Sequence, residues 1–207
     1  MQGSRGMRTI GRTGLVAITI AAVFLVLGGS CVATYNRLVR LDQAAQAQWA
    51  QVENVYQRRA DLVPNLVATV KGAAAFERET ITAVTDARSR VGQVAAPDIT
   101  TNPEAFRANQ QAQDALGGAL SRLLVVAEAY PNLTATQAFR DLQAQLEGTE
   151  NRIAVERMRY NEAARDFNAA RASFPTSIVA GMFGRRFVEK QFFTAKPGSE
   201  TPPQVRF

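Results

Sequence analysis

Apolar residues recur at steps of three and four along most of the chain, and no window alternates apolar and polar residues as a strand would. The apolar stripes cover residues 38–56, 66–91, 106–127 and 139–174. An uncharged run, Thr13–Asn36, comes before them. The pattern predicts an all-α protein with one apolar N-terminal helix followed by four amphipathic helices.

The uncharged run is long enough to cross a bilayer, which needs about 20 apolar residues in a helix. Its centre, Leu15–Leu27, is apolar apart from Thr19. Three arginines precede the run, and two arginines and then an aspartate follow it. The flanking charges favour a cytoplasmic N-terminus, so we expect a single-pass protein of the bacterial cell membrane with its helical domain outside the cytoplasm. These residues are Arg5, Arg8, Arg12, Arg37, Arg40 and Asp42.

Two other interpretations of this run stay open at the level of sequence. A cleaved signal peptide would have small residues at its cleavage site, and Gly28-Gly29-Ser30 supplies them. A lipoprotein would be cleaved before Cys31 and anchored through that residue, although Leu27 stands one position too early for the usual pattern. The length of the uncharged run favours the uncleaved anchor.

Glycine, proline and capping residues divide the remainder into helices. No Gly or Pro lies between Ser30 and Asp61, so the anchor and the first amphipathic helix are expected to form one rod that breaks at Asp61–Pro64. Thr101 with Glu104, and Thr134 with Gln137, have the spacing of capping boxes. Short connections then predict an antiparallel up-and-down four-helix bundle with long helices.

The predicted organisation has four parts: a basic segment over residues 1–12, an anchor over 13–35, the bundle over 36–174, and a basic C-terminal arm over 175–207. Residues 174–207 contain six of the eleven phenylalanines. Phe174 completes the last stripe and is expected to pack on the bundle, whereas Phe183 and later residues are expected to face lipid or a partner. The end, with three prolines after Lys196, is expected to be disordered.

Charge and composition exclude several classes of protein. The net charge is +6, but residues 36–184 contain equal numbers of basic and acidic side chains, so the excess lies at the two ends. A nucleic-acid surface would need basic groups on the folded domain, and we therefore expect no nucleic-acid partner. The absence of histidine and the single cysteine exclude histidine-based catalysis, disulfides within the chain and the usual zinc sites.

Two glutamates, Glu77 and Glu156, fall on apolar stripes and are the candidates for site chemistry. Di-iron sites in bundles also need histidines, so the glutamates are expected to reach solvent at a stripe edge or to pair with arginines such as Arg58 or Arg59. Lys71 is expected to be an exposed helix residue, and Gly117-Gly118 to permit close helix packing. The sequence thus predicts no catalytic, cofactor-binding or metal-binding residues, no cofactor and no small-molecule substrate.

Several motifs resemble the LemA family over nearly the whole soluble part of the chain. They are Trp49 and Val52, Tyr56–Val67, Val70-Lys71-Gly72, Glu77, Glu128–Leu133, Tyr160-Asn161, Phe167-Asn168 and Phe174-Pro175. The resemblance implies a short N-terminal segment, a membrane anchor and a helical bundle. It brings no established biochemical activity.

Three functions follow as hypotheses. The first is a membrane-anchored, non-enzymatic scaffold or adaptor of the bacterial envelope, which binds lipid through its anchor and works through unidentified protein partners. The alternative is a bundle that acts on the membrane surface through its basic-aromatic C-terminal arm. The third, ranked lowest, is a hydrolase that uses Glu77 or Glu156.

Overall fold

The structure is a computed structural model of the 207-residue chain, and it describes residues 12–72, 77–94, 99–184 and 186–194. Within these ranges the regular elements are all helices, with no strand. The all-α prediction is therefore confirmed. The helices are α1 (Arg12–Lys71), α2 (Arg78–Gln93), α3 (Pro103–Ala127), α4 (Pro131–Thr134), α5 (Gln137–Ala172) and α6 (Thr176–Met182).

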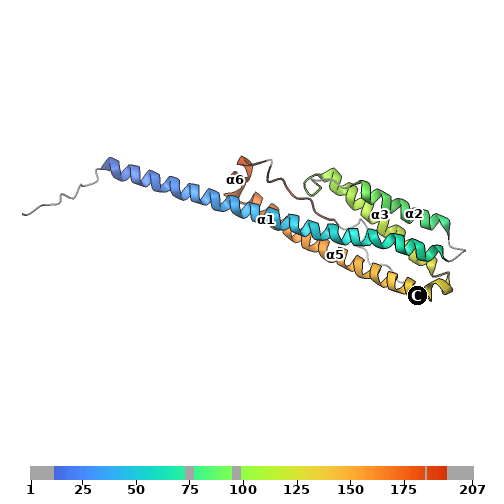
Figure 1. The fold of residues 1–207 in the computed structure, drawn as a ribbon. Helices are drawn as coiled ribbons and strands as arrows, with labels where there is room; N and C mark the ends of the chain where they lie inside the picture. The colour runs from blue at the N-terminus through green and yellow to red at the C-terminus, as the bar shows by residue number, and fades with distance from the viewer. Residues whose placement is uncertain (1–11, 73–76, 95–98, 185, 195–207) are drawn as a thin grey trace, which may run out of the picture.

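Helix α1 is a single helix of 60 residues, about 90 Å long at 1.5 Å per residue. Its first part projects alone from the body of the molecule (Figure 1), and we call residues 14–34 the stem. Large apolar side chains of the stem are exposed, for example Phe24 at 70% and Leu25 at 77%. From Leu38 onward the same helix contributes fully buried side chains. The prediction of one rod through anchor and domain is confirmed.

The predicted break at Asp61–Pro64 is wrong, because α1 continues through Pro64 to Lys71. Proline lacks the N–H that would bond to the carbonyl four residues earlier, which is that of Ala60. Arg88 of α2 supplies a replacement donor: its Nε donates to the Ala60 oxygen at 2.9 Å. The predicted second helix is thus the end of α1 followed by α2.

Helices α1 and α5 lie along each other over most of the length of α5 (Figure 1). Leu38 of α1 shares a core cluster with Phe167 of α5. Further along α1, Tyr56 is hydrogen-bonded to Arg157, and Arg59 to Glu150. Helices α2 and α3 pack on each other and cover the part of this pair that lies far from the stem.

The buried side chains of the described residues form three clusters along the rod. The cluster farthest from the stem is almost wholly aliphatic and includes Leu66, Val70 and Leu123. The middle cluster is aromatic, built around Trp49, Phe106 and Tyr160. The cluster next to the stem joins Leu38 to Phe167, Ala180 and Phe187. The stripe of the fourth predicted helix is therefore on the buried face, and Ile153 at its centre is 4% exposed.

Two helix starts differ by one or two residues from the predicted caps. The cap of α3 is Asn102, whose Oδ1 accepts hydrogen bonds from the backbone N–H groups of Glu104 and Ala105. The cap of α5 is Thr136, which accepts from Phe139 N–H. Thr134 instead ends the short helix α4. Asparagine and threonine are both favoured caps, and in each case a nearby residue with such a side chain takes the role.

The C-terminal part of the chain packs differently from the prediction. Phe174 is 82% exposed and does not complete the buried stripe. Phe187 is fully buried, and Phe193 packs against the middle cluster. Residues 186–194, which we call the C-terminal strap, contain no helix and bond to side chains of α5. Phe174, predicted to pack, is thus exposed, and Phe187 and Phe193, predicted to face lipid or a partner, pack on the domain, whereas Phe183 and Phe192 are 44% and 39% exposed. The prediction of disorder after Lys196 falls outside the described residues.

Candidate functional site

The side chain of Arg59 in α1 is buried, with 3% of its surface exposed. Its Nη1 donates to Glu150 of α5 at 2.8 Å. Its Nη2 donates to the main-chain oxygen of Gln113 of α3 at 2.9 Å, and also to the Gln113 side chain. A Cβ atom added at Gly117 would lie 3.4 Å from Nη1, so this glycine faces the charge. Arg59 thereby ties α1 to both α3 and α5, as a buried charge requires.

A second arginine of α5 continues this polar network. Arg157 Nε donates to the Tyr56 hydroxyl at 2.8 Å, and its Nη2 lies 3.3 Å from Asp114. Burial raises the pKa of Tyr56 above its ordinary value, although the positive charges of Arg157 and Arg59 act in the lowering direction. Tyr56 is therefore neutral at physiological pH. The network consists of ion pairs and hydrogen bonds between helices, and only Arg59 Nε among its described donors is buried without a partner. This is the chemistry of a structural tie between helices.

The two candidate glutamates lie in different places. Glu77 is exposed just before α2 and accepts a hydrogen bond from Thr80. Glu156 is half-buried and pairs with Arg159 at 2.9 Å. The prediction of an edge or paired position describes both, although Arg59 pairs with Glu150 instead. Lys71 is exposed, as predicted. The described residues hold no group of three or more Cys, Asp or Glu side chains that could bind a metal ion.

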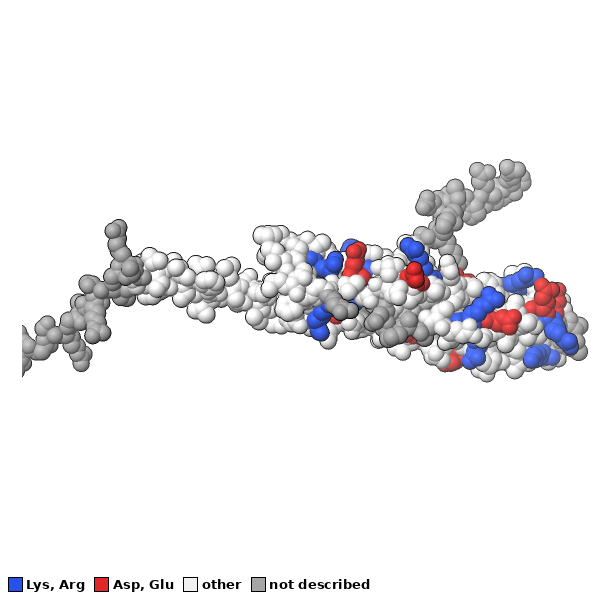
Figure 2. Space-filling view, turned by 90° about the horizontal axis from the view of Figure 1, so that it is seen from above, with Lys and Arg blue, Asp and Glu red and all other residues white. Residues whose placement is uncertain are grey.

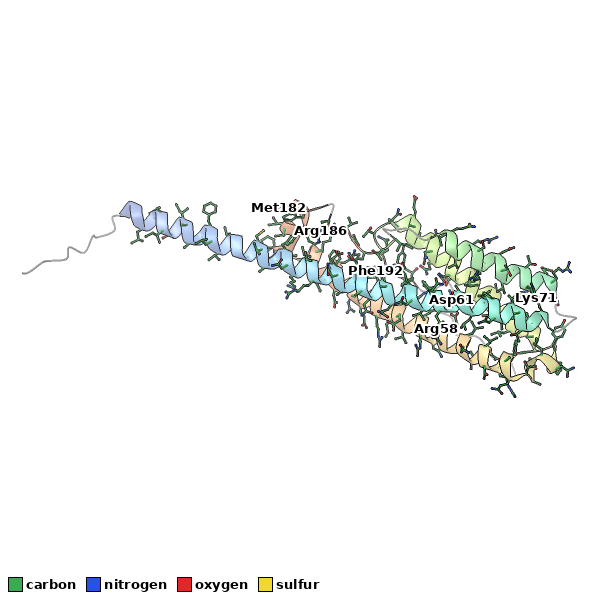
Figure 3. All side chains as sticks on the ribbon, in the orientation of Figure 1. Arg58, Asp61, Lys71, Met182, Arg186 and Phe192 are labelled. Atoms are coloured by element: carbon green, nitrogen blue, oxygen red, sulfur yellow. The ribbon has the colours of Figure 1, made fainter. Side chains whose placement is uncertain are left out.

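Glu156 also lines an open groove between α1 and α5. The groove carries charges of both signs, with Arg58 and Asp61 from α1 and Arg152 from α5. Figure 3 places Arg58 and Asp61 on the part of α1 that runs beside α5. A mixed, open and polar groove is suited to contact with another polypeptide rather than to enclosing a small molecule. The remaining lining residues are Gln51, Asn54, Val55, Gln57, Leu62, Asn65 and Gln145.

Two asparagines of α5 hold the C-terminal strap through its backbone. The Asn168 amide donates to the Lys190 carbonyl and accepts from the Lys190 N–H, both at 2.9 Å. Asn161 makes the same pair of bonds with Phe193, also at 2.9 Å. Tyr160 donates its hydroxyl proton to the Gln191 carbonyl at 3.0 Å. An extended segment that lacks its own hydrogen-bond ladder thus obtains one from the helix.

The side chain of Lys190 adds a buried ion pair to this contact. Its Nζ lies 2.7 Å from Asp42 Oδ1, and the two side chains are only 5% and 11% exposed. The same ammonium lies 5.4 Å from the centre of the Phe167 ring. The sequence interpretation missed Lys190, Asn161 and Asn168 as functional positions. The sequence signal for the two asparagines is the repeat of Tyr160-Asn161 as Phe167-Asn168, one heptad apart, which places both asparagines on one face of α5.

The stem is the one described helix segment that is long and apolar enough to cross a membrane, with a mean hydropathy of 2.5 and none of its window buried. Cys31, the candidate lipid-modification site, is half-buried within α1. An exposed apolar surface of this length has no stable place in water. The stem is therefore the feature that most constrains where the protein acts.

Comparisons with known proteins agree with this fold. A model of the LemA family matches residues 48–207. The magnetosome proteins MamQ 1 and MamQ 2 of Paramagnetospirillum magneticum are each 26% identical to the chain, over 94% of this chain and 78% of the relative. The magnetosome protein MamQ of Magnetospirillum gryphiswaldense is 28% identical, over 83% of this chain and 70% of that protein. Together with the exposed stem, these matches indicate a membrane-associated helical protein.

Proposed function

The chain belongs to the LemA family, and from that premise we propose that it is a membrane-anchored, non-enzymatic scaffold that holds protein partners at a fixed distance from a bacterial membrane. The stem is the anchor. The helical domain is the part that partners bind.

One observation carries the proposal: α1 passes from the exposed stem into the buried core without interruption. A membrane protein whose domain only needed to be tethered would tolerate a flexible linker at this point. Here the helix that crosses the membrane also provides Leu38, Trp49 and Val52 to the core. From Asn36 to Lys71 it extends about 54 Å at 1.5 Å per residue. The domain is therefore coupled rigidly to the anchor.

The arrangement that we propose for the domain is an antiparallel up-and-down bundle of α1, α2, α3 and α5. The pairing of Leu38 with Phe167 and of Arg59 with Glu150 supports opposite directions for α1 and α5, because later residues of one meet earlier residues of the other. The arginines before the stem support a cytoplasmic N-terminus, with the domain outside the cytoplasm.

The open groove between α1 and α5 is the surface that we assign to a partner protein. It is lined by charges of both signs that are not all used within the domain. Among the described residues, Arg58 and Arg152 form no ion pair, and Glu156 Oε2 is buried without a hydrogen-bond partner. A partner that brings both donors and acceptors would satisfy these groups. The likeness to MamQ supports the membrane setting and the fold, and it adds no catalytic role.

The test is photo-cross-linking in living cells with the full chain. A photoreactive phenylalanine analogue replaces Arg58 in the groove, and in a matched variant it replaces Arg122, an exposed arginine of α3 outside the groove. Membranes are isolated after irradiation, and adducts are identified by mass spectrometry. We expect a discrete protein adduct from position 58 and none from position 122.

Three outcomes would contradict the proposal. Recovery of the chain in the soluble fraction would remove the anchor. Adducts of equal yield from both positions would show non-specific collision. Membrane-bound protein without an adduct at position 58 would remove the groove as a partner site.

A further inference from the structure

Helix α6 exposes a line of large apolar side chains. Ile178 and Met182 are 56% and 71% exposed and lie four residues apart on this helix, and Phe174, in the turn before it, is 82% exposed. Steps of four keep side chains on one face of a helix. The opposite face of α6 is buried against the domain through Val179 and Ala180. The helix therefore has two apolar faces, and the described residues cover only one of them.

The position of α6 along the rod is fixed by contacts with α1. The ring of Tyr35 lies 4.9 Å from that of Phe183 and 5.5 Å from that of Phe187, centre to centre. From Gly14 to Tyr35 the stem rises about 32 Å, which matches a hydrocarbon core of about 30 Å. Helix α6 thus stands beside α1 at the level where the anchor would leave the bilayer (Figure 1).

The surface around α6 has the composition of a membrane interface. Figure 2 shows that the stem and the adjoining end of the wider body carry no charged surface in that view. Arg37 and Arg186 are exposed just beyond this region, and Figure 3 shows Met182 and Arg186 at the end of the domain that faces the stem. Aromatic side chains such as Tyr35 favour the headgroup level, and arginines favour anionic lipid just outside it.

We propose that α6, with Phe174 and Phe183 on either side of it, inserts its uncovered apolar face into the surface of the membrane that the stem crosses. The proposal rests on the stem being the anchor. The ligand is the lipid surface itself, because Phe183, directly after α6, contacts Tyr35 at the end of the stem, and Arg37 and Arg186 are exposed close by. With two points of contact, one spanning and one interfacial, the domain has a fixed rotation and tilt relative to the bilayer.

The experiment measures depth in a bilayer with the full chain. Cys31 is replaced by alanine, and one new cysteine is placed at Ile178, at Val23 in the stem, or at Val125. Val125 is 65% exposed on α3, which makes it a matched exposed apolar control far from the stem. Each variant is labelled with an environment-sensitive dye and reconstituted in vesicles of phosphatidylcholine and phosphatidylglycerol. Lipids that carry a nitroxide quencher near the headgroup or deep in the acyl chain are then added.

We expect the dye at position 178 to be quenched most by the headgroup nitroxide. The dye at position 23 should be quenched most by the deep nitroxide, and the dye at 125 by neither. Quenching at 23 without quenching at 178 would overturn the interfacial role and leave the anchor intact. No quenching at either position would remove the anchor itself. A blue-shifted but unquenched dye at 178 would show that protein, such as a second copy, covers α6 and would also overturn the proposal.

Circular dichroism of each labelled variant confirms that the helices are intact. A second variant, Ile178→Glu, places a charge on the same face without a dye. We expect it to abolish headgroup quenching of a probe at Met182, while a Val125→Glu variant leaves that quenching unchanged. Equal quenching in the two variants would contradict burial of this face in lipid.

Discussion

The pair formed by α1 and α5 is covered in two different ways along its length. Far from the stem, α2 and α3 lie over it, and the core there is almost entirely aliphatic. Near the stem, α6 and the C-terminal strap take their place, and the contacts involve Trp49, Tyr160, Phe187 and Phe193. One half of the domain is therefore packed helix on helix, and the other is closed by an extended segment.

The difference follows from how each cover satisfies its backbone. Helices α2 and α3 bond their own N–H and C=O groups and need only an apolar stripe to pack. The strap has no ladder of its own, so Asn161, Asn168 and Tyr160 supply bonds to three of its residues. An extended segment also buries less area per residue than a helix pair. Large aromatic rings and a buried ion pair compensate for this.

The largest expected effect is on Phe187, which fastens the strap to the cluster next to the stem. Phe187→Ala should lower the free energy of unfolding by about 3–5 kcal/mol, because a large buried ring leaves a cavity. The measurement is urea unfolding of the full chain in detergent micelles, followed by circular dichroism. Phe174→Ala is the control and should stay within about 0.5 kcal/mol of the original protein. Similar losses from both would place Phe174 in the core.

The ion pair of Lys190 and Asp42 should be nearly as sensitive. Lys190→Met leaves the Asp42 carboxylate buried without its partner, and such a change costs about 3–5 kcal/mol. The double variant Asp42→Leu with Lys190→Met removes both charges and should recover most of that loss. The same unfolding measurement separates the two. If the double variant is no more stable than Lys190→Met alone, the ion pair itself stabilises the fold, and the loss in the single variant does not come mainly from an unpaired buried charge.

The aliphatic and aromatic packing of α5 is tested at Ile153, in the middle cluster. Ile153→Ala should cost about 2–5 kcal/mol, since the side chain is 4% exposed. Val155, two residues later on the same helix, is 40% exposed, and Val155→Ala should change stability by about 0.5 kcal/mol or less. Equal effects would indicate that α5 is rotated about its axis relative to the described orientation.

The two halves also differ in how far the sequence predicts them. The stripes of α3 and α5 are regular, so their extents were predicted within a few residues. The break predicted at Pro64 is absent because Arg88, which lies on another helix, supplies the hydrogen-bond donor that proline lacks. Local rules treat proline as a helix breaker and contain no information on such a partner. For Glu77 and Glu156 the sequence predicts only an edge or paired position. Which residue each one contacts cannot be predicted, because a stripe position does not specify the contacts of a long polar side chain.

The strap was not predicted for a different reason. Its main contacts are made by the backbone of Lys190 and Phe193, and backbone groups carry no sequence pattern. Phe174 fitted the heptad of α5, but the helix ends at Ala172 and the chain turns away before the ring reaches the core. Periodicity predicts a face only while the helix continues.

The asparagine contacts should have a smaller and more local effect. Asn168→Ala removes one donor and one acceptor from Lys190, and loss of bonds to a buried backbone costs about 1–3 kcal/mol. We expect faster hydrogen exchange at the Lys190 amide and little change in the aliphatic cluster. The reason is that the strap can detach locally while the part of the domain covered by α2 and α3 stays folded. Asn151→Ala, at an exposed asparagine of the same helix, is the control. Uniformly faster exchange would show that the two halves unfold together.

The smallest expected effect comes from Tyr160, and it depends on pH. Burial raises the pKa of its hydroxyl above the ordinary value of 10.0. The folded domain thus favours the neutral phenol, which donates to the Gln191 carbonyl. Its contribution to stability is complete below pH 10.0, the value of the unfolded chain, and is lost as the pH rises toward the folded pKa, because the unfolded chain releases the proton first.

Tyr160→Phe keeps the ring and removes the hydroxyl. At neutral pH it should cost about 1 kcal/mol, the typical contribution of one hydrogen bond. Above pH 10.0 the free energy of unfolding should fall less steeply with pH in the variant than in the original protein. A remaining slope is expected, since burial also raises the pKa of Tyr56. Parallel curves for the two proteins across this range would show that Tyr160 ionises equally in the folded and unfolded chains, and that the strap leaves its hydroxyl open to water.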